Sequence, residues 1–437
     1  MKLISISRLF FLSILISIPF AGNTQIPTAY GPRSKSMAGA GIANVENSLW
    51  GNLNPGGLVF LGQKSGLGIA FLSPTASYQV IGEPTSFEPT LSSQWSLGLQ
   101  PGLVEAEKKL NIVPHLGFNM VINEESTIGI SIYGNSNRGY SYETKTYYSP
   151  IIADFGSNEG FINPMGTVSS PTFMELNQYF ASISYSRKIG GKIGIGLSAI
   201  GAWQSLNLGG LEAFGSLNYS AHPQELTNND MDNSFGIGGK IGVQWNASEK
   251  VQLAVAYQTK IYMSNMESYQ GFISESGKLD IPAEWNIGVV YHPFDRFLMA
   301  LDVSSYCYSG VDSWALSMRQ NNSVQLGGEN GGGFGRMNQL SYKFGVQYKI
   351  PKWQFRAGYA HSDHSIVESE VLLNLLMPEI TNDYASIGLS RNIGKRVISI
   401  AVVKGFKNSF VGYNNLDTAQ LIELNTESWT MELAIEF

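Results

Sequence analysis

The stretch AGAGIANVENSLWGNLNPGGL, residues Ala38–Leu58, precedes the first strand-like segment of the chain. Its run of Ala and Gly allows the backbone to pack closely against another surface, and Gly also tolerates a positive φ. The tetrapeptide NPGG predicts a turn, because Pro55 fixes its own φ, holds Asn54 extended, and is followed by two glycines that permit a reversal. The stretch is too Gly-rich for a stable helix and too irregular for a strand, so it predicts a plug, or hatch, inside a large β-barrel. The residues expected to shape and gate this hatch are Trp50, Asn54, Pro55, Gly56 and Gly57.

The chain opens with a segment that has the features of a removable leader. Lys2 and Arg8 supply its positive charge. Leu9–Ala21 supplies an apolar core of about 13 residues, which is too short to span a bilayer as a helix. We expect cleavage between Ala21 and Gln25. The expected organisation is a signal peptide at 1–24, a hatch at 25–65, and a barrel at 66–437.

Composition excludes several classes of protein. The formal net charge is −6 and becomes more negative without the leader, which argues against a nucleic-acid partner because such partners need a basic face. The single cysteine, Cys307, has no partner for an internal disulfide, and we expect it to be a small apolar filler. Past the leader, no apolar run approaches the ~20 residues of a membrane helix. The chain is therefore either a soluble secreted protein or a β-barrel in a membrane.

Alternation of residue types decides between these two classes. From about residue 66 the sequence breaks into roughly fourteen segments in which large apolar residues alternate with small or polar ones. The clearest are 251–258, 284–291, 340–349 and 429–437. In a soluble sandwich the polar face would carry many Lys and Glu residues, but here it carries mostly Gly, Ser, Ala, Asn and Gln. Small side chains suit a crowded barrel interior and large apolar ones suit lipid, so the pattern predicts an all-β fold, a transmembrane antiparallel β-barrel of about 14 strands.

The connections between these segments alternate in length. Short turns are expected at 123–126, 188–192, 246–250, 292–296, 350–352 and 392–396. Long connections are expected at 83–107, 135–174, 208–232, 264–280, 309–337, 362–382 and 407–425, with a flexible loop tip at 329–335. Short turns at one end and long loops at the other are typical of outer-membrane barrels. An even number of strands places both ends of the barrel on the short-turn, periplasmic side.

Four stretches of the chain resemble the outer-membrane long-chain fatty acid transporter family (FadL type, of the OMPP1/FadL/TodX superfamily). The first is WGNLNPGGL within the hatch, which is similar to the family's Asn-Pro-Ala-Gly-Leu motif. The others are residues 281–314, WQFRAGYAH at 353–361, and PEITNDYASIG at 378–388. Their order and the strand pattern cover essentially the whole mature chain. The chain departs from the family at Gly56, where the family usually has Ala, and this makes the hatch turn looser.

The resemblance implies a monomeric barrel in the outer membrane of a Gram-negative-type bacterium, with a hatch that blocks its lumen. It also implies that a hydrophobic ligand is captured at extracellular loops, enters the barrel and leaves sideways through a gap in the wall into membrane lipid. The physics agrees, because an apolar route with a lateral exit keeps a long acyl chain out of water. We therefore predict uptake of hydrophobic small molecules, with long-chain fatty acids as the leading ligand.

A competing hypothesis is a barrel of the same fold that serves as a scaffold in a secretion or surface-assembly system. A continuous apolar path from the loops to the hatch would favour transport, whereas a polar, filled lumen would favour the scaffold. A general polar porin is a third possibility, and the hatch argues against it.

The loop at 135–174 is the first candidate for ligand binding. It includes Tyr147, Tyr148, Phe155 and Phe161, and a purely solvated loop would not carry so much apolar area. The loop either folds over the barrel mouth as a ligand-capturing surface or packs on itself as a lid.

The connection at 362–382 is also rich in apolar residues. Val367, Val371 and Leu375 recur at helical spacing and predict a short amphipathic helix. In the alternative interpretation this segment packs against the barrel rim or lipopolysaccharide.

Two cations are predicted to face the lumen. Arg356 alternates with Trp353, Phe355 and Tyr359, and a buried guanidinium is suited to bind a ligand carboxylate in a bidentate pair. Lys343 is a second candidate for the same role. The alternative for both residues is that they hold the plug or a wall carboxylate such as Glu432.

Catalysis is not expected. His361, Ser362 and Asp363 are adjacent in sequence, but a catalytic triad is defined by geometry, and the chain contains no Gly-x-Ser-x-Gly elbow. The sequence shows no zinc spacing and no phosphate-binding loop. We therefore predict neither an enzyme nor a bound metal or cofactor.

Overall fold

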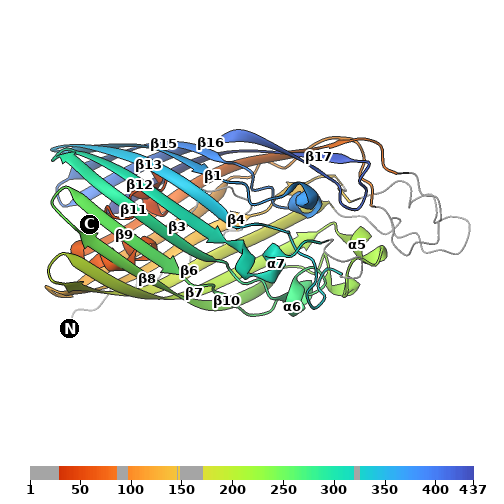
Figure 1. Ribbon diagram of the computed structural model, residues 1–437, viewed down its shortest axis with the longest axis horizontal. Helices are drawn as coiled ribbons and strands as arrows, with labels where there is room; N and C mark the ends of the chain where they lie inside the picture. Colours follow the sequence, from red (N-terminus) through yellow and green to blue (C-terminus); the bar gives the residue numbers. More distant parts are fainter. Residues whose placement is uncertain (1–28, 86–96, 145, 148–170, 319–324) are drawn as a thin grey trace, which may run out of the picture.

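The computed structural model describes residues 29–85, 97–144, 146–147, 171–318 and 325–437. These residues form one antiparallel sheet that closes into a barrel (Figure 1). The predicted signal peptide at 1–24 lies outside the described residues. No helix in the described ranges is long and apolar enough to cross a membrane.

Within the described chain, fourteen long strands make up the closed ring, which confirms the predicted fold class. They are β1 (Lys64–Ile81), β3 (Asn111–Asn123), β4 (Ser126–Arg138), β6 (Thr172–Ile189), β7 (Ile193–Gly209), β8 (Asp232–Asn246), β9 (Val251–Gln258), β11 (Ala283–Phe294), β12 (Phe297–Cys307), β13 (Gln339–Ile350), β14 (Trp353–Ser362), β15 (Asp383–Ile393), β16 (Arg396–Tyr413) and β17 (Leu421–Glu436). Three short strands, β2 (Gly102–Glu105), β5 (Ser141–Tyr142) and β10 (Tyr262–Met263), extend the wall. The ring closes where β1 pairs with β17, from Gly66↔Glu436 to Ile81↔Leu421.

The alternation of residue types determines which way each strand faces. On β13, Tyr342 is 49% exposed on the outer surface, whereas its neighbours Ser341 and Lys343 are buried in the lumen. Large apolar residues face outward in the same way along the other strands, and Ser, Gly, Asn and Gln face inward. This arrangement is the one that a lipid-embedded barrel requires.

Short turns and long connections alternate as predicted, except at one predicted long connection. The stretch 407–425 is mostly strand, because β16 continues to Tyr413 and β17 starts at Leu421. Its outward positions mix polar residues such as Ser409 and Glu423 with exposed Val411, Tyr413 and Leu421, which weakened the alternation signal. Inward Ile422 and Leu424 are fully buried. The ladder between the two strands resumes beyond a bulge between Gly405 and Asn408.

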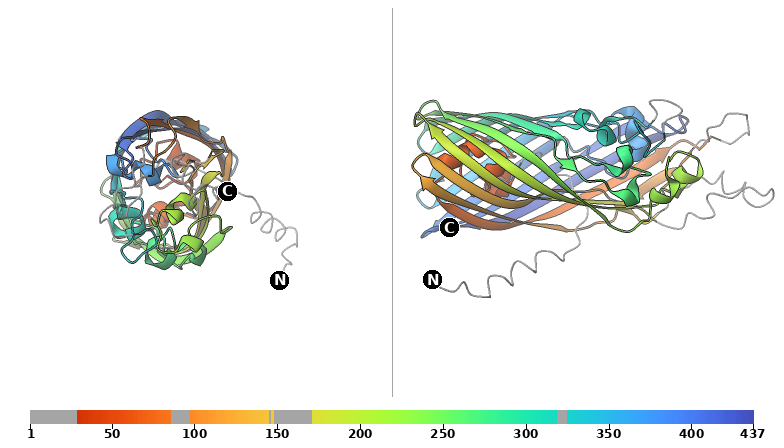
Figure 2. Two further views of the ribbon diagram at one scale, coloured as in Figure 1. Left: turned by 90° about the vertical axis from the view of Figure 1, so that its right-hand side faces the viewer. Right: turned by 90° about the horizontal axis from the view of Figure 1, so that it is seen from below.

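The barrel interior is filled in two halves. The half nearest the short turns contains residues 29–63, here called the inner segment, with helices α2 (Gly31–Lys35), α3 (Trp50–Leu53) and η2 (Pro55–Phe60). Figure 2 shows this red segment inside the strands at that end. The other half is filled by a cluster of buried apolar side chains, here called the outer cluster, to which the long connections contribute. The short helices of those connections are α5 (Glu212–Ser216), η3 (Pro223–Glu225), η4 (Glu267–Tyr269), α6 (Ser274–Gly277), η5 (Tyr308–Gly310), α7 (Asp312–Ala315), η6 (Glu368–Glu370) and α8 (Val371–Asn374).

Candidate functional site

The inner segment is attached to the barrel wall by side chains on both partners. Asn54 caps η2 by accepting from the Gly56 amide at 3.0 Å, and its own amide donates to Gln244 Oε1 on β8 at 3.2 Å. Trp50 is buried and donates its indole N–H to the Ile42 carbonyl at 3.2 Å, so it braces the segment against itself. Each of these polar groups has lost its contact with water and is compensated by a partner inside the barrel.

The glycines of the NPGG turn serve close approach rather than a positive φ. Neither Gly56 nor Gly57 is among the residues with positive φ. A Cβ placed on Gly56 would lie 2.5 Å from the Gly242 carbonyl oxygen on β8 and 2.7 Å from that of Gly194 on β7. A glycine is needed on the wall as well, because a Cβ on Gly196 of β7 would lie 2.3 Å from the Pro55 carbonyl carbon. The turn is therefore packed tightly against β7 and β8, where the sequence had indicated a looser one.

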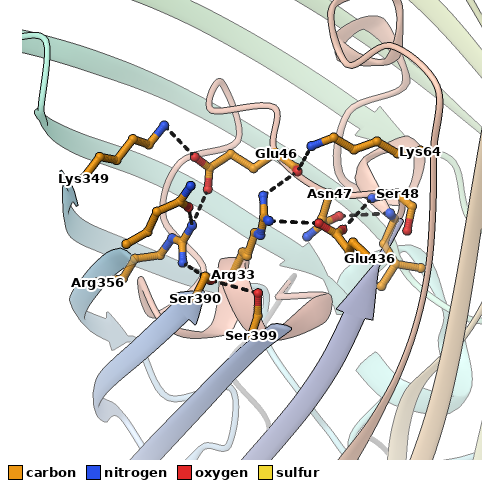
Figure 3. Close-up of polar contacts among 12 residues, drawn as sticks. Arg33, Glu46, Asn47, Ser48, Lys64, Lys349, Arg356, Ser390, Ser399 and Glu436 are labelled. Carbon is orange, nitrogen blue, oxygen red and sulfur yellow. Dashed lines mark hydrogen bonds and ion pairs between the residues drawn. The ribbon is translucent and has the colours of Figure 1, made fainter. Parts of the chain in front are cut away.

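Buried ion pairs fasten the inner segment on the opposite wall (Figure 3). Glu46 lies between two wall cations, with Arg356 Nη2 at 2.9 Å and Lys349 Nζ at 3.0 Å. Arg33 of the inner segment pairs with Glu436 of β17 at 3.0 Å and donates to the Glu46 carbonyl at 2.7 Å. We call these five residues the anchor cluster. The Lys349 side chain is 40% exposed, but the other four charges are buried and depend on one another, because removing one partner leaves the other without compensation.

The two predicted lumen cations have partners within the barrel. Arg356 donates to Ser390 Oγ at 2.7 Å and to Gln347 and Gln354 in addition to Glu46. Lys343 lies opposite Asp302 in the β12–β13 ladder, and Asp302 Oδ2 accepts from the Ile42 amide at 2.8 Å.

Both lumen cations thus stand beside the inner segment, and the contacts favour the alternative role of holding the plug. Glu432, which the sequence had suggested as a partner, pairs instead with Lys35 at 2.8 Å and His115 at 3.2 Å.

The outer cluster contains the described part of the two apolar loops. Tyr147 is buried and donates its hydroxyl to the Leu372 carbonyl at 2.9 Å. Tyr142 does the same to the Leu375 carbonyl at 2.9 Å. The predicted amphipathic helix is a single turn, α8, whose apolar residues point into the cluster. Tyr148, Phe155 and Phe161 lie outside the described residues, so their predicted role in ligand binding stays a prediction.

A second charged group, which the sequence analysis missed, lies within the outer cluster. Arg138 at the end of β4 and Arg336 both bind the carboxylate of Glu379, and Arg138 Nε donates to it at 2.6 Å. The Trp314 ring lies 4.7 Å from the Arg138 guanidinium and 5.6 Å from that of Arg336. We call the two arginines with Glu379 the arginine pair site.

Electrostatics keep this site ionised. Burial alone would raise the pKa of Glu379, but the two guanidiniums outweigh that effect and lower its pKa to about 2. The carboxylate therefore stays charged above that pH, and its stabilising contribution is lost only as the pH falls through it.

The sequence signal for this site was hidden in the Gly-rich stretch 329–335. We predicted a flexible loop tip, but Phe334 is 2% exposed and packs inside the barrel. The glycines allow this because a Cβ on Gly333 would lie 2.2 Å from the Ser313 carbonyl oxygen. Arg336 comes two residues after Phe334. A buried aromatic and a cation next to the Gly-rich stretch were therefore the available sequence signal for this site.

The barrel wall has a gap in its hydrogen bonding, here called the seam. In the described chain, β3 pairs with β4 only from Leu116↔Ile132 to Asn123↔Ser126. Residues 111–115 of β3 pair with β1, and 133–138 of β4 pair with β6, but these two stretches do not pair with each other. The seam ends farther along, where the Glu107 amide donates to the Ser141 carbonyl at 2.8 Å.

Side chains occupy the seam where the backbone ladder is missing. On the β4 side, Tyr133 stacks on Phe180 of β6 with ring centroids 5.2 Å apart and meets Tyr30 of the inner segment edge-on at 4.8 Å. Val113 lies against Gly134, where an added Cβ would be 2.6 Å from Val113 Cγ1. Side-chain contacts of this kind can part without breaking a ladder, which paired strands cannot do.

A family model described as outer membrane protein transport protein (OMPP1/FadL/TodX) matches residues 13–399. The fold is similar to that of the toluene transporter TodX from P. putida, with a TM-score of 0.63 at 15% identity, over 93% of this chain and 98% of that one. No curated protein matches the sequence.

Two further solved structures share the fold. A FadL homologue from Pseudomonas aeruginosa gives a TM-score of 0.66 at 14% identity, over 96% of this chain and 99% of that one. The monoaromatic hydrocarbon channel CymD gives 0.55 at 16% identity, over 94% and 98%.

The close packing of the turn predicts the effect of restoring the family's Ala. Gly56→Ala should lower the stability of the folded barrel by about 1–3 kcal/mol, because the new methyl group overlaps two wall carbonyls. The matched control is Gly310→Ala, where nothing lies within 4 Å of the new Cβ. Urea unfolding from lipid vesicles measures both, and equal stability of the two variants would contradict the tight contact.

The anchor cluster predicts an energetic coupling between Glu46 and Arg356. Glu46→Gln should destabilise the barrel by about 3–5 kcal/mol, because it leaves the buried guanidinium of Arg356 uncompensated. Combining it with Arg356→Gln should restore part of that loss in a double-mutant cycle. The exposed pair Glu125–Arg187, at 3.8 Å, is the control, and Glu125→Gln should change stability by less than about 0.5 kcal/mol. A coupling energy of zero between Glu46 and Arg356 would contradict the structural role and favour ligand binding by Arg356.

Proposed function

The chain belongs to the OMPP1/FadL/TodX family of outer-membrane transport proteins, and on this basis we propose that it carries hydrophobic small molecules across the outer membrane. Long-chain fatty acids are the leading substrate class. The solved relatives include a toluene transporter and a monoaromatic hydrocarbon channel, which supports a hydrophobic substrate without selecting one. The transport needs no energy input from this chain.

The observation that carries the proposal is an apolar interior next to an unpaired part of the wall. The outer cluster offers a hydrophobic solute an environment free of water, and burial of apolar surface there is favourable. The seam lies beside this cluster, and Ile132 and Phe118 are exposed on the outer surface next to it. The proposed route runs from the long loops through the outer cluster and sideways through the seam into lipid.

The inner segment acts as a hatch in this proposal. It fills the half of the lumen nearest the short turns, which we assign to the periplasmic side, and its polar and charged contacts make that half unsuitable for an apolar solute. Asn54, Pro55 and Gly56 hold the hatch against β7 and β8, while Trp50 and Gly57 brace it from within. The lateral seam then remains as the apolar exit.

The scaffold hypothesis is less well supported. A scaffold needs only a stable filling of the lumen, and polar contacts of the kind seen around the inner segment would suffice throughout. The outer cluster is instead built from aliphatic and aromatic residues, and through Ala106 and Tyr140 it reaches the end of the seam. This asymmetry supports transport of apolar molecules.

Locking the seam tests the route. In a Cys307→Ser background, Val113→Cys with Gly134→Cys should form a disulfide across the seam and reduce uptake of oleate and of toluene to the level of cells without the protein. Reduction should restore uptake, because the seam can then open. The matched control is Phe118→Cys with Ile130→Cys, a pair that lies directly opposite in the bonded part of the same strands. Unchanged uptake by the oxidised seam variant would exclude this exit.

A further inference from the structure

The segment that contains Glu379 combines one charged carboxylate with several buried apolar side chains. Leu375, Leu376, Met377 and Ile380 are fully buried in the outer cluster. A few residues later the Glu379 carboxylate reaches the arginine pair site, where Tyr308 also donates to it at 3.2 Å. We call residues 371–380 the internal arm.

The arginine pair site is organised around a carboxylate. Arg336 is oriented by two further contacts, to Asn374 Oδ1 at 3.0 Å and the Met377 carbonyl at 2.6 Å. Two guanidiniums and one tyrosine hydroxyl thus converge on a single acidic group, with the Trp314 ring beside both guanidiniums. Guanidinium groups bind carboxylates through paired, charge-assisted hydrogen bonds, and they do so most strongly away from water.

The other buried acid of this region does not share the site. Glu370 accepts hydrogen bonds from Ser317 Oγ at 2.6 Å and Ser369 Oγ at 2.9 Å. Its carboxylate therefore holds the arm to a neighbouring loop without an arginine. Glu379 is the acid of the arm that has a cation-lined site of its own.

The arm is held in place by its buried apolar side chains and by hydrogen bonds to its backbone. Tyr142 and Tyr147 donate hydroxyls to its carbonyls, and the Tyr140 amide donates to the Leu376 carbonyl at 3.0 Å. A ligand can therefore displace the arm only if it replaces both its charge and its buried apolar surface.

We propose that the internal arm occupies, through Glu379 and its apolar neighbours, a binding site for a hydrophobic monocarboxylate, and that such a ligand binds by displacing it. The proposal rests on the proposed transport function and narrows its substrate class. An incoming carboxylate replaces Glu379 on Arg138 and Arg336, so the buried charge stays balanced. A neutral hydrocarbon cannot make this exchange, because it would leave two buried cations unpaired.

The test compares oleate with oleyl alcohol on the full mature protein folded in nonionic detergent. Trp314 fluorescence reports on the site, and Trp314→Phe identifies its share of the signal. Removing the internal competitor should strengthen ligand binding in proportion to its occupancy. Glu379→Gln should therefore raise oleate affinity at least about ten-fold and leave oleyl alcohol unchanged. Arg138→Gln should abolish the preference for the acid.

Glu370→Gln is the matched control, since it removes a buried carboxylate from the same arm but not from the arginine pair site. It should give no gain in oleate affinity. An equal gain for acid and alcohol in Glu379→Gln, or the same gain in Glu370→Gln, would overturn the proposal, because it would show that the arm only blocks space.

If Glu379→Gln does not fold, hydrogen exchange measured on the unmodified protein tests the same proposal. Saturating oleate should speed hydrogen exchange of the backbone amides at 371–380, and oleyl alcohol should not. Oleate binding without faster exchange would overturn the proposal. The transport function stands if both ligands are taken up while the arm stays protected, and it fails if neither ligand enters through the seam.

Discussion

The buried carboxylate of Glu46 is the constraint on which the inner half of the barrel depends. It belongs to the inner segment, and its cations, Arg356 and Lys349, belong to strands far away in sequence. A carboxylate enclosed by the barrel is stable only next to compensating cations, so the wall determines where the segment lies. Glycines on both partners then allow the backbones to approach closely on the opposite side.

This anchoring divides the interior by chemistry. The half around the inner segment combines ion pairs and hydroxyl contacts with small apolar clusters. The half beneath the long loops holds the large aliphatic and aromatic outer cluster, within which the arginine pair site lies. The polarity of the interior therefore changes along the barrel axis, for a polar and for an apolar solute alike. The seam lies where the two halves meet, since Tyr133 contacts the inner segment and Arg138 belongs to the arginine pair site. The proposed lateral route leaves the barrel at this junction.

Much of the wall was predictable, because alternation is a local signal. It indicated the strand number, the lumen-facing positions of Arg356 and Lys343, and most of the connections. It failed at 407–425, where polar and apolar residues are mixed on the outward face and the contrast between the two faces is weak.

Pairings across the barrel were not predictable from one sequence. Nothing local indicates that Arg356 meets Glu46, or that Arg138 and Arg336 share Glu379. The purpose of Gly56 was hidden for the same reason, since it depends on carbonyls of β7 and β8 rather than on the turn itself.

The most direct test of this account is a crystal structure with a bromine-labelled long-chain acid bound, in which anomalous scattering locates the bromine. The account predicts bromine in the outer cluster and beside the seam near Val113 and Gly134, with the Glu46–Arg356 ion pair intact. Bromine along the barrel axis in the half near the short turns, with that ion pair broken and the inner segment displaced, would contradict it.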